Sequence, residues 1–361
     1  MLNILGRIRK VFDNCDADVI FLMNTKEQDS NFTYLCGFTS GVFENTPLIV
    51  ARKKLVLLVS VLEYEIAKEQ RPKGMEVVKV DSSKRAREIM VKYMKSKTVG
   101  INGDYLPYNY YSTIKKRIKP KRLIDVSSAF GRARSVKGSD EIENITVANR
   151  IARKALGIVK GKLKAGMTEK EVAAMIDYDM MKMGASGASF DSIVAFNKNT
   201  ALPHHMPDET KLKENSIVLI DIGAKYNNYC SDITRTFMFR PDPKSARYKR
   251  FADIFNTVRK AQKLSYQYVK DGLPGSKAHD AAANYIDRAR NGAYKGRFIH
   301  SLGHAVGIEV HDTGPGLSPV SKEKLESNMV VSNEPGIYIV GFGGVRLEED
   351  VIVTKKGAKI I

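Results

Sequence analysis

The stretch from Val218 to Thr236 reads V-L-I-D-I-G-A-K-Y-N-N-Y-C-S-D-I-T-R-T. Two runs rich in β-forming residues flank Tyr226-Asn227-Asn228, which suits a tight turn, so the stretch predicts an antiparallel hairpin. A turn centred between Tyr226 and Asn227 places Asp221 directly opposite Asp232. Two paired carboxylates repel each other, and a divalent cation between them would remove the repulsion. The alternative is a hairpin whose two Asp side chains face water, and this stretch alone does not separate the two.

The last third of the chain contains a second acidic pair. Ser327–Glu334 and Gly344–Thr354 are strand-like, and a loop rich in Gly and Pro joins them. A register centred on Gly341 places Glu334 opposite Glu348. The sequence therefore predicts a second hairpin that carries two facing carboxylates.

Between the two hairpins, His residues are concentrated. Three of the six His of the chain lie within twelve residues, at positions 300, 304 and 311, and packing alone does not explain this. Four carboxylates and an imidazole suit two divalent ions, which is the arrangement that two-metal hydrolases use. Without metal, some of the carboxylates would have to bind protons or find cationic partners.

Five motifs occur in series along these segments. They are D-I-G at 221–223, S-D-I-T-R-T at 231–236, H-S-L-G-H-A-V-G at 300–307, N-E-P-G-I-Y at 333–338 and V-R-L-E-E-D at 345–350. In this order and spacing they resemble the metallopeptidases with the pita-bread fold, namely prolidase, aminopeptidase P, methionine aminopeptidase and creatinase. The resemblance is close over about residues 140–361 and looser before them.

The resemblance implies a set of metal ligands, which are Asp221, Asp232, His304, Glu334 and Glu348. Asp232 and Glu348 would bridge two divalent ions. Asp221 would hold one ion, and His304 and Glu334 would hold the other. Mn or Co is the expected metal, with Zn or Fe as alternatives, because all four accept this set of oxygen and nitrogen ligands.

The resemblance also implies residues that act on substrate. Glu334 would pass a proton to the leaving nitrogen, and His204 and His311 would donate hydrogen bonds to the oxyanion of the tetrahedral intermediate. For His204, preferred to its neighbour His205, a structural role stays open. The remaining expected contacts are Phe190, His300 and Tyr338 around the proline ring and Arg346 at the carboxylate of a dipeptide.

The length of 361 residues predicts two domains. Residues 1–132 alternate strand-like and helix-like runs without a metal-ligand cluster, and they are expected to form a small mixed α/β domain like the N-terminal domain of creatinase and prolidase. Residues 133–139 are expected to be a linker. The resemblance implies that residues 140–361 form the pita-bread catalytic domain of an α+β protein with internal pseudo-two-fold symmetry. A faint repeat of a helical segment followed by a hairpin agrees with that symmetry but does not establish it alone.

Local patterns predict individual elements. Helix starts are expected at two capping-box pairs, Asp140 with Glu143 and Thr168 with Glu171. The segment 31–38 resembles a turn of prolidase-type N-terminal domains. In the first domain, strands are expected at 17–23, 47–50, 55–59, 76–80 and 98–101, and helices at 82–97 and 108–118.

The net charge of +19 is concentrated early in the chain, where residues 1–139 contain 26 Lys and Arg against 14 Asp and Glu. The densest basic run, Lys115–Arg122, could be a nucleic-acid patch or a solvated helix end. The second interpretation is favoured because no nucleic-acid motif accompanies the run.

Three Cys without metal-ligand spacing indicate reduced thiols in a cytoplasmic protein. The N-terminus does not resemble a signal peptide, and the longest apolar stretch, Leu55–Leu62, is too short to span a membrane.

These observations predict a dinuclear-metal exopeptidase that hydrolyses Xaa-Pro bonds, with a preference for Xaa-Pro dipeptidase (prolidase). Aminopeptidase P is the alternative, and a metal-free binding protein on the same fold is a more distant one. The presence of competent residues at all five ligand positions favours an enzyme. The expected partners are short proline-containing peptides and, by resemblance, a second copy of the chain in a homodimer.

Overall fold

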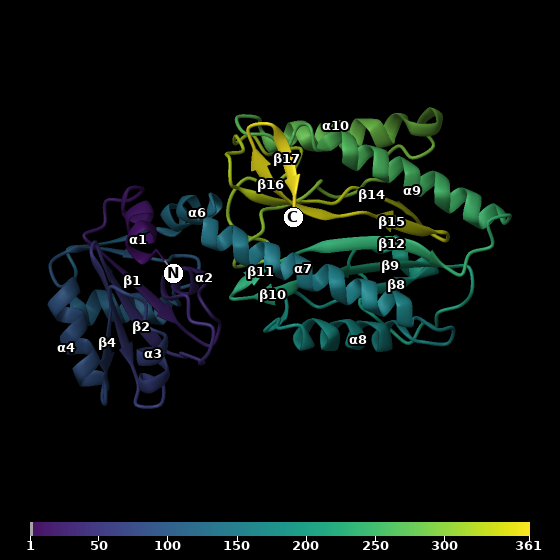
Figure 1. Ribbon diagram of the computed structural model, residues 1–361. Helices are drawn as coiled ribbons and strands as arrows, with labels where there is room; N and C mark the ends of the chain where they lie inside the picture. The colour runs from purple at the N-terminus through teal and green to yellow at the C-terminus, as the bar shows by residue number, and fades with distance from the viewer. Residues whose placement is uncertain (1–2) are drawn as a thin grey trace. The chain divides into compact units, whose positions relative to one another are not determined.

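The computed structural model describes residues 3–361 (Figure 1). It divides into two compact units, of which the first ends at Arg134 and the second comprises Ser135–Ile361. Among the described residues, no helix is both long and apolar enough to cross a membrane.

The first unit is built on one six-stranded mixed sheet with the order β4-β3-β2-β1-β5-β6. β1 pairs in parallel with β5 and antiparallel with β2. The strands are β1 (Val19–Asn24), β2 (Thr46–Ala51), β3 (Lys54–Val59), β4 (Met75–Lys79), β5 (Thr98–Ile101) and β6 (Arg122–Asp125). The helices are α1 (Ile4–Phe12), α2 (Ser30–Cys36), α3 (Tyr64–Gln70), α4 (Ser83–Met94), α5 (Tyr108–Thr113), the π-helix η1 (Ile114–Ile118) and α6 (Ser127–Ser135).

Each strand and helix predicted in this unit is present, with ends that differ by a few residues, but five elements escaped the prediction. These are α1, α2, α3, β6 and α6. The predicted turn at 31–38 is wrong, because Ser30–Cys36 is helical: Asp29 accepts the Asn31 N–H at 2.8 Å, and Gly37 ends the helix at φ 65°. α6 similarly covers the beginning of the expected linker. These helices are short, and short helices carry a weak periodic signal.

The second unit repeats one order of elements. Two helices are followed by antiparallel strands, and the whole arrangement then occurs again. The first half contains α7 (Ser139–Lys162), α8 (Glu169–Lys182), β7 (Gly187–Ala188), β8 (Ile193–Phe196), the 3-10 helix η2 (Asn197–Ala201), β9 (Ser216–Ile222), β10 (Ala224–Tyr226), β11 (Tyr229–Cys230) and β12 (Ile233–Phe239). The second half contains α9 (Ala246–Ser265), α10 (Gly275–Arg288), η3 (Ala289–Gly292), β13 (Val330–Asn333), β14 (Gly336–Ile339), β15 (Gly343–Arg346), β16 (Glu349–Thr354) and β17 (Gly357–Ile360).

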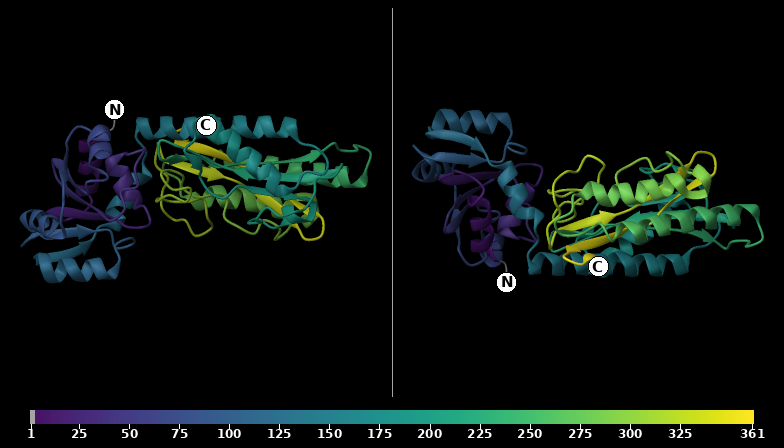
Figure 2. Two further views of the ribbon diagram at one scale, coloured as in Figure 1. Left: turned by 90° about the horizontal axis from the view of Figure 1, so that it is seen from below. Right: turned by 90° about the horizontal axis from the view of Figure 1, so that it is seen from above.

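Each half has its own hydrophobic core. In the first half, Val218 and Ile220 of β9 pack against apolar side chains of α7 and α8 such as Ala155 and Ile176. In the second half, strand residues such as Val351 pack against α9 and α10. In Figure 1 the strands lie between α8 on one side and α9 and α10 on the other, and both views of Figure 2 show α7 along one side of them. Fully burying one such aliphatic side chain contributes roughly 1.5–3 kcal/mol, so each core rigidly supports its strands.

The first hairpin forms in a different register from the predicted one. Its turn is Asn227-Asn228, both with positive φ (46° and 69°), which is the backbone that two-residue hairpin turns use. Thr234, not Asp232, therefore lies opposite Asp221. The pairing shifts by two residues, and because side chains alternate with period two, Asp221 and Asp232 still share one face.

The second hairpin has the predicted register. Asn333 pairs with Glu349 and Gly336 with Arg346, which is the alignment centred on Gly341. The predicted loop between the strands is shorter than expected, because β14 and β15 continue the ladder up to the turn. This alignment brings the segments that carry Glu334 and Glu348 next to each other.

The two predicted capping boxes have different outcomes. The Thr168 pair is confirmed, because Thr168 Oγ1 accepts the Glu171 N–H and the Glu171 carboxylate accepts the Thr168 N–H. The Asp140 pair is wrong. α7 begins two residues earlier than this pair predicts, and the Glu141 carboxylate accepts the N–H of the capping residue Gly138 at 2.8 Å.

Candidate metal centre

A pocket of about 360 Å³ lies in the second unit. It collects predicted site residues from both halves, and its wall also includes Ile193, Pro203, Ser301 and Val310. The predicted site residues in its wall are Phe190, His204, Asp221, Asp232, His300, His304, His311, Glu334, Arg346 and Glu348. Tyr338 is the one predicted site residue that does not line this pocket.

The four acidic side chains are divided equally between the halves. Asp221 lies on β9 and Asp232 directly precedes β12. Glu334 directly follows β13, and Glu348 directly precedes β16. Ligand atoms of Asp232, His304 and Glu348 lie within 4.8 Å of one another. The centre therefore forms where the ends of the two hairpins meet.

The imidazole of His304 is oriented toward these carboxylates. Its Nδ1 lies 3.2 Å from the carbonyl oxygen of Ala305, to which it donates its proton. Its Nε2 lies 3.5 Å from Asp232 Oδ2 and 3.4 Å from Glu334 Oε1. Burial, reinforced by the neighbouring His311, lowers the pKa of His304 to about 4, so the ring is neutral. A neutral ring whose Nδ1 carries the proton presents the Nε2 lone pair to two carboxylates.

The carboxylates are buried close together. Burial, and next the charge of Glu348, raises the pKa of Asp232 well above its ordinary value. Burial and the Glu334 charge do the same to the pKa of Glu348, and burial raises the pKa of Glu334 to about 8. Three buried oxygens, Asp221 Oδ1, Asp232 Oδ1 and Glu348 Oε1, have no hydrogen-bond donor among residues 3–361.

These features fit divalent cations. Buried carboxylate oxygens are ordinarily hydrogen-bonded, and here lone pairs of an imidazole and several carboxylates face one another instead. A cation among them would bind these lone pairs and offset both the burial and the mutual repulsion of the carboxylates, which together raise their pKa values. Oxygen ligands with one imidazole are a donor set that first-row divalent metals accept.

Polar residues behind the pocket hold the acidic side chains. Thr234 Oγ1 donates to Glu348 Oε2 at 2.5 Å. Asp350 Oδ2 accepts from the Asp232 N–H and from Asn149 Nδ2, both at 2.8 Å. Sequence reasoning missed these roles. For Thr234 a signal existed, because it lies two residues after Asp232 on the same strand face, whereas Asn149 lies in a helix far away in sequence and gave none.

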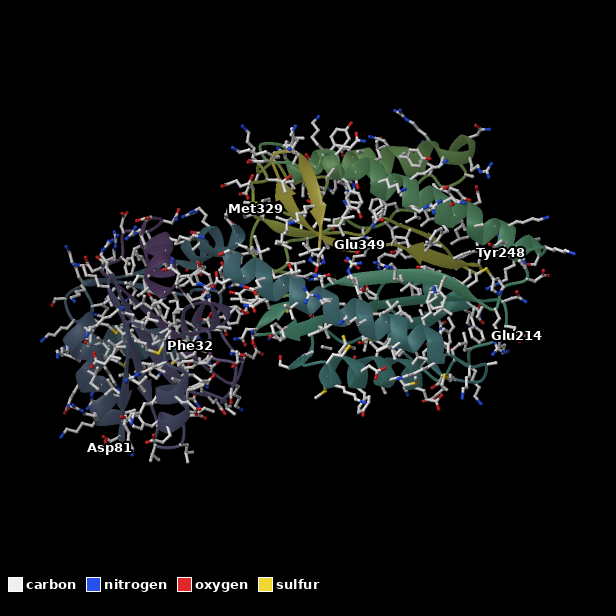
Figure 3. All side chains as sticks on the ribbon, viewed as in Figure 1. Phe32, Asp81, Glu214, Tyr248, Met329 and Glu349 are labelled. Atoms are coloured by element: carbon white, nitrogen blue, oxygen red, sulfur yellow. The ribbon has the colours of Figure 1, made fainter. Side chains whose placement is uncertain are left out.

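Glu349 lies on the opposite face from Glu348, as strand alternation predicts. Its carboxylate pairs with Arg153 of α7 and, at 2.7 Å, with Arg235 of β12. The side chain, labelled in Figure 3, is thus engaged outside the pocket.

Arg346 does not offer the free guanidinium fork that the sequence led us to expect. Its Nη2 donates to Asp221 Oδ2 at 2.5 Å and to the carbonyl oxygen of Pro203, and its Nε donates to Thr234 Oγ1. Its Nη1 donates to the Tyr338 hydroxyl at 2.9 Å. Four of the five N–H groups are therefore used, because the strand face that carries Arg346 also faces Asp221 and Thr234.

Tyr338 does not line the pocket of the acidic residues, and its expected place beside the proline stays a prediction. Its hydroxyl accepts from Arg346 and lies 2.8 Å from His300 Nε2, to which it donates. His300 Nδ1 in turn donates to the carbonyl oxygen of Ser301. Burial, and next the Arg346 charge, lowers the pKa of His300 to about 4, so this ring is also neutral. Tyr338 thereby orients two pocket residues.

The adjacent residues His204 and His205 have different surroundings. His204 lines the pocket, whereas His205 Nε2 lies 2.7 Å from Glu169 Oε2. Glu169, His205 and Asp208 form a second group with metal-ligand geometry. In this group, however, N–H donors from the protein already occupy both oxygens of Glu169. His311 lines the pocket with its ring against that of His304, with ring centroids 4.1 Å apart.

Outside this unit, the basic run forms part of η1 and the segment after it, where Lys115, Lys116, Arg117 and Lys119 are exposed. The three Cys residues are free thiols.

Two family models match the chain. Residues 143–355 match metallopeptidase family M24, and residues 5–136 match the creatinase/prolidase N-terminal domain.

Individual proteins are similar over nearly the whole chain. The Xaa-Pro dipeptidase of Pyrococcus furiosus is 36% identical over 98% of this chain and 96% of its own. The solved structure of an Xaa-Pro dipeptidase from Bacillus anthracis has a TM-score of 0.87 at 32% identity, covering 99% of this chain and 96% of its own. That of an X-Pro aminopeptidase from Thermotoga maritima has the same TM-score, 0.87, at 29% identity, covering 97% of both chains. The creatinase-type N-terminal domain and the pita-bread catalytic fold predicted from the sequence are thus confirmed.

Proposed function

Because the chain belongs to metallopeptidase family M24, we propose that it is an exopeptidase that cleaves Xaa-Pro bonds, and specifically an Xaa-Pro dipeptidase. One observation carries this proposal: buried carboxylates from two hairpins, three of whose oxygens have no donor among residues 3–361, converge on the Nε2 lone pair of a neutral His304. The name of the Pyrococcus furiosus relative, Xaa-Pro dipeptidase, supports the substrate class. An Xaa-Pro aminopeptidase is the alternative.

We assign the binding of two divalent ions, Mn or Co, to the five residues Asp221, Asp232, His304, Glu334 and Glu348. The resemblance to the family implies that Asp232 and Glu348 would be shared by both ions, and the proximity of these two residues to each other and to His304 supports that assignment. When bound, the ions supply Lewis-acid polarisation of the peptide carbonyl and acidify water.

Side chains around the ions would transfer the proton, stabilise the oxyanion and contact the proline ring. Glu334, at the edge of the cluster, would carry a proton to the departing proline nitrogen. His204 and His311 line the same pocket and would donate hydrogen bonds to the oxygen on which negative charge develops. Phe190 and His300 would provide ring faces for the proline, and the hydrogen bonds from Arg346 to Tyr338 and from Tyr338 to His300 would orient the His300 ring.

Arg346 would act mainly as the group that holds Asp221. With four N–H groups engaged, one remains for a substrate carboxylate, which allows a single hydrogen bond in place of the bidentate pair. A dipeptide and a longer peptide would differ by that one contact.

Hydrolysis of Xaa-Pro dipeptides beside Xaa-Pro-Yaa tripeptides, with Mn or Co added, tests the proposal. Faster turnover of the dipeptide is expected. Faster turnover of the tripeptide would make the protein an aminopeptidase, and turnover of neither by the metal-loaded protein would contradict the Xaa-Pro specificity itself.

The setting in which the enzyme works is part of the proposal. We place it in the cytoplasm, in keeping with three free thiols, and as a homodimer that acts on short peptides and neither on membranes nor on nucleic acid. Light scattering would test the dimer. Tight DNA binding at physiological salt would contradict the interpretation of Lys115–Arg122 as a solvated surface, since nonspecific binding falls steeply with salt.

A further inference from the structure

A buried carboxylate holds the loop that carries His204. Glu169 is the first residue of α8, and its side chain is 0% exposed. Each of its oxygens accepts two hydrogen bonds from the segment 196–208. The donors are Phe196 N (2.6 Å) and Asn199 Nδ2 (3.0 Å) at Oε1, and His205 Nε2 (2.7 Å) and Asp208 N (3.1 Å) at Oε2.

The other side of the loop is held by β15. Thr200 Oγ1 accepts the Gly344 N–H at 2.7 Å, and a Cβ at Gly344 would collide with the Thr200 carbonyl oxygen, so η2 packs closely against this strand. The Pro203 carbonyl oxygen accepts from Arg346 at 3.4 Å. His204 is therefore flanked by one residue that Arg346 holds and one that Glu169 holds.

The bond between His205 and Glu169 has the properties of an orienting contact. An apolar contact would tie the loop to α8 without requiring a carboxylate to lose its hydration, and burial indeed raises the pKa of Glu169. A charge-assisted hydrogen bond is directional, however, and it fixes the rotation of the imidazole and of the backbone that bears it. Because His204 is adjacent in the chain, the same bond limits where the His204 ring can lie.

We propose that Glu169 and His205 are positioning residues that set the imidazole of His204 in the pocket and affect turnover through His204. The inference rests on the proposed function for its kinetic consequence. The two neighbouring imidazoles then have different roles: His204 contacts the substrate, and His205 fixes the orientation of His204.

The structure supplies a matched control. Lys170 and Glu209 link the same two segments by an ion pair of 2.9 Å, but their side chains are 60% and 74% exposed. Exposed pairs of this kind contribute little. The variant Lys170→Ala thus removes a contact between α8 and the loop without disturbing the buried one.

A double-mutant cycle tests the proposal. His205→Ala is expected to lower kcat for an Xaa-Pro dipeptide by about tenfold with KM within about twofold, because a small misplacement of a catalytic group is costly in rate. In a His204→Ala background the same change should alter kcat by less than about twofold, since the group being aimed is gone. An equal drop in both backgrounds would overturn the proposal and assign His205 to general stability.

Two further variants sharpen the result. His205→Gln places an amide N–H near the position of Nε2 and should restore most of kcat, whereas Lys170→Ala should leave kcat unchanged. Failure of the rescue, or a Lys170→Ala loss as large as that of His205→Ala, would contradict a role specific to the Glu169 bond. Melting temperatures verify that all variants are folded.

A second measurement keeps this inference separate from the proposed function. With six His in the chain, the ring resonances of His204 can be assigned by NMR of His-labelled protein. The chemical shifts of the His204 ring should change in His205→Ala and remain unchanged in Lys170→Ala, whichever substrate the enzyme prefers. Unchanged His204 resonances in His205→Ala would overturn the positioning role, whereas a wild-type protein that is inactive on Xaa-Pro peptides would contradict only the proposed function.

Discussion

Two groups of acidic and imidazole side chains lie in the second unit, one formed by Asp232, His304 and Glu348 and the other by Glu169, His205 and Asp208. By residue type and spacing they are alike. In the Glu169 group, each oxygen of the Glu169 carboxylate accepts two hydrogen bonds from the protein. In the Asp232 group, buried oxygens have no donor among the described residues.

The difference shows that the number of N–H and O–H donors around a buried carboxylate decides whether it has a structural or a cation-binding role. A carboxylate whose lone pairs accept hydrogen bonds from backbone and side-chain donors of the protein is a structural anchor. One whose lone pairs face other lone pairs must bind a cation or a proton. The tautomer of the imidazole reports the same distinction, since His205 Nε2 donates to Glu169 whereas His304 directs its proton to a backbone carbonyl and leaves Nε2 open.

The largest expected effect lies in the group without donors. Asp232→Asn or Glu348→Gln should lower kcat/KM at least about 100-fold, because each removes a charge shared between the ions. Glu349→Gln is the control, since Glu349 pairs with Arg153 and Arg235 on the opposite face. Near-native turnover of either ligand variant with full metal content would show that the bridging assignment is wrong.

Metal removal should destabilise the surroundings of the Asp232 group and leave those of the Glu169 group unchanged. At metal concentrations about 100-fold above Kd, binding stabilises a protein by about 2.7 kcal/mol, so chelation should lower the melting temperature of the second unit by about 5–10 °C. Amide exchange at Phe196 and Asp208, whose N–H groups bind Glu169, should change little in the native state. Calorimetry and hydrogen exchange measure the two quantities, and an unchanged melting temperature after verified metal loss would contradict the electrostatic account of the Asp232 group.

Arg346 tests whether the centre depends on its supports. Arg346→Lys keeps the charge but loses the planar fork that reaches Asp221, Thr234 and Tyr338 together. We expect kcat/KM to fall about tenfold on an Xaa-Pro-Yaa tripeptide, and only slightly more on an Xaa-Pro dipeptide, whose carboxylate has a single hydrogen bond to lose. A loss confined to the dipeptide would restore the carboxylate-binding role first expected from the sequence.

The smallest effect is expected beside the Glu169 group. Lys170→Ala should leave the melting temperature and the metal content unchanged, because its pair with Glu209 is exposed to solvent. Thermal unfolding followed by circular dichroism and metal analysis measure both. A clear loss of stability would mean that the anchoring of this loop is shared and not concentrated in Glu169.

The sequence predicted correctly those features that depend only on neighbouring residues, such as the register of the second hairpin and the face of a strand on which a side chain lies. The register around Gly341 followed from a Gly-rich turn between two clear strands, and the period of two kept Asp221 and Asp232 on one face even though the turn was misplaced by one residue. The turn itself was misplaced because Tyr226, Asn227 and Asn228 allow two centres, and only the backbone selects the one with both Asn at positive φ.

The supporting contacts could not be predicted in the same way. Arg346 pairs with Asp221, which is 125 residues away in sequence, and Asn149 reaches Asp350 over 201 residues. No local pattern encodes which long side chain occupies the space behind a strand, since that depends on the packing of separate elements. The bond between His205 and Glu169 could not be predicted either, because the sequence around Glu169 indicates only the start of a helix.

The equal division of the four pocket carboxylates between the two halves has a consequence for the order in which the site is assembled. A single half, with its own core and one hairpin, offers two of the four acidic groups, so neither half can form the centre before the other has folded against it. Formation of the centre therefore reports the docking of the two halves and not the folding of either one. The Glu169 anchor differs in this respect, because all of its partners lie in the first half.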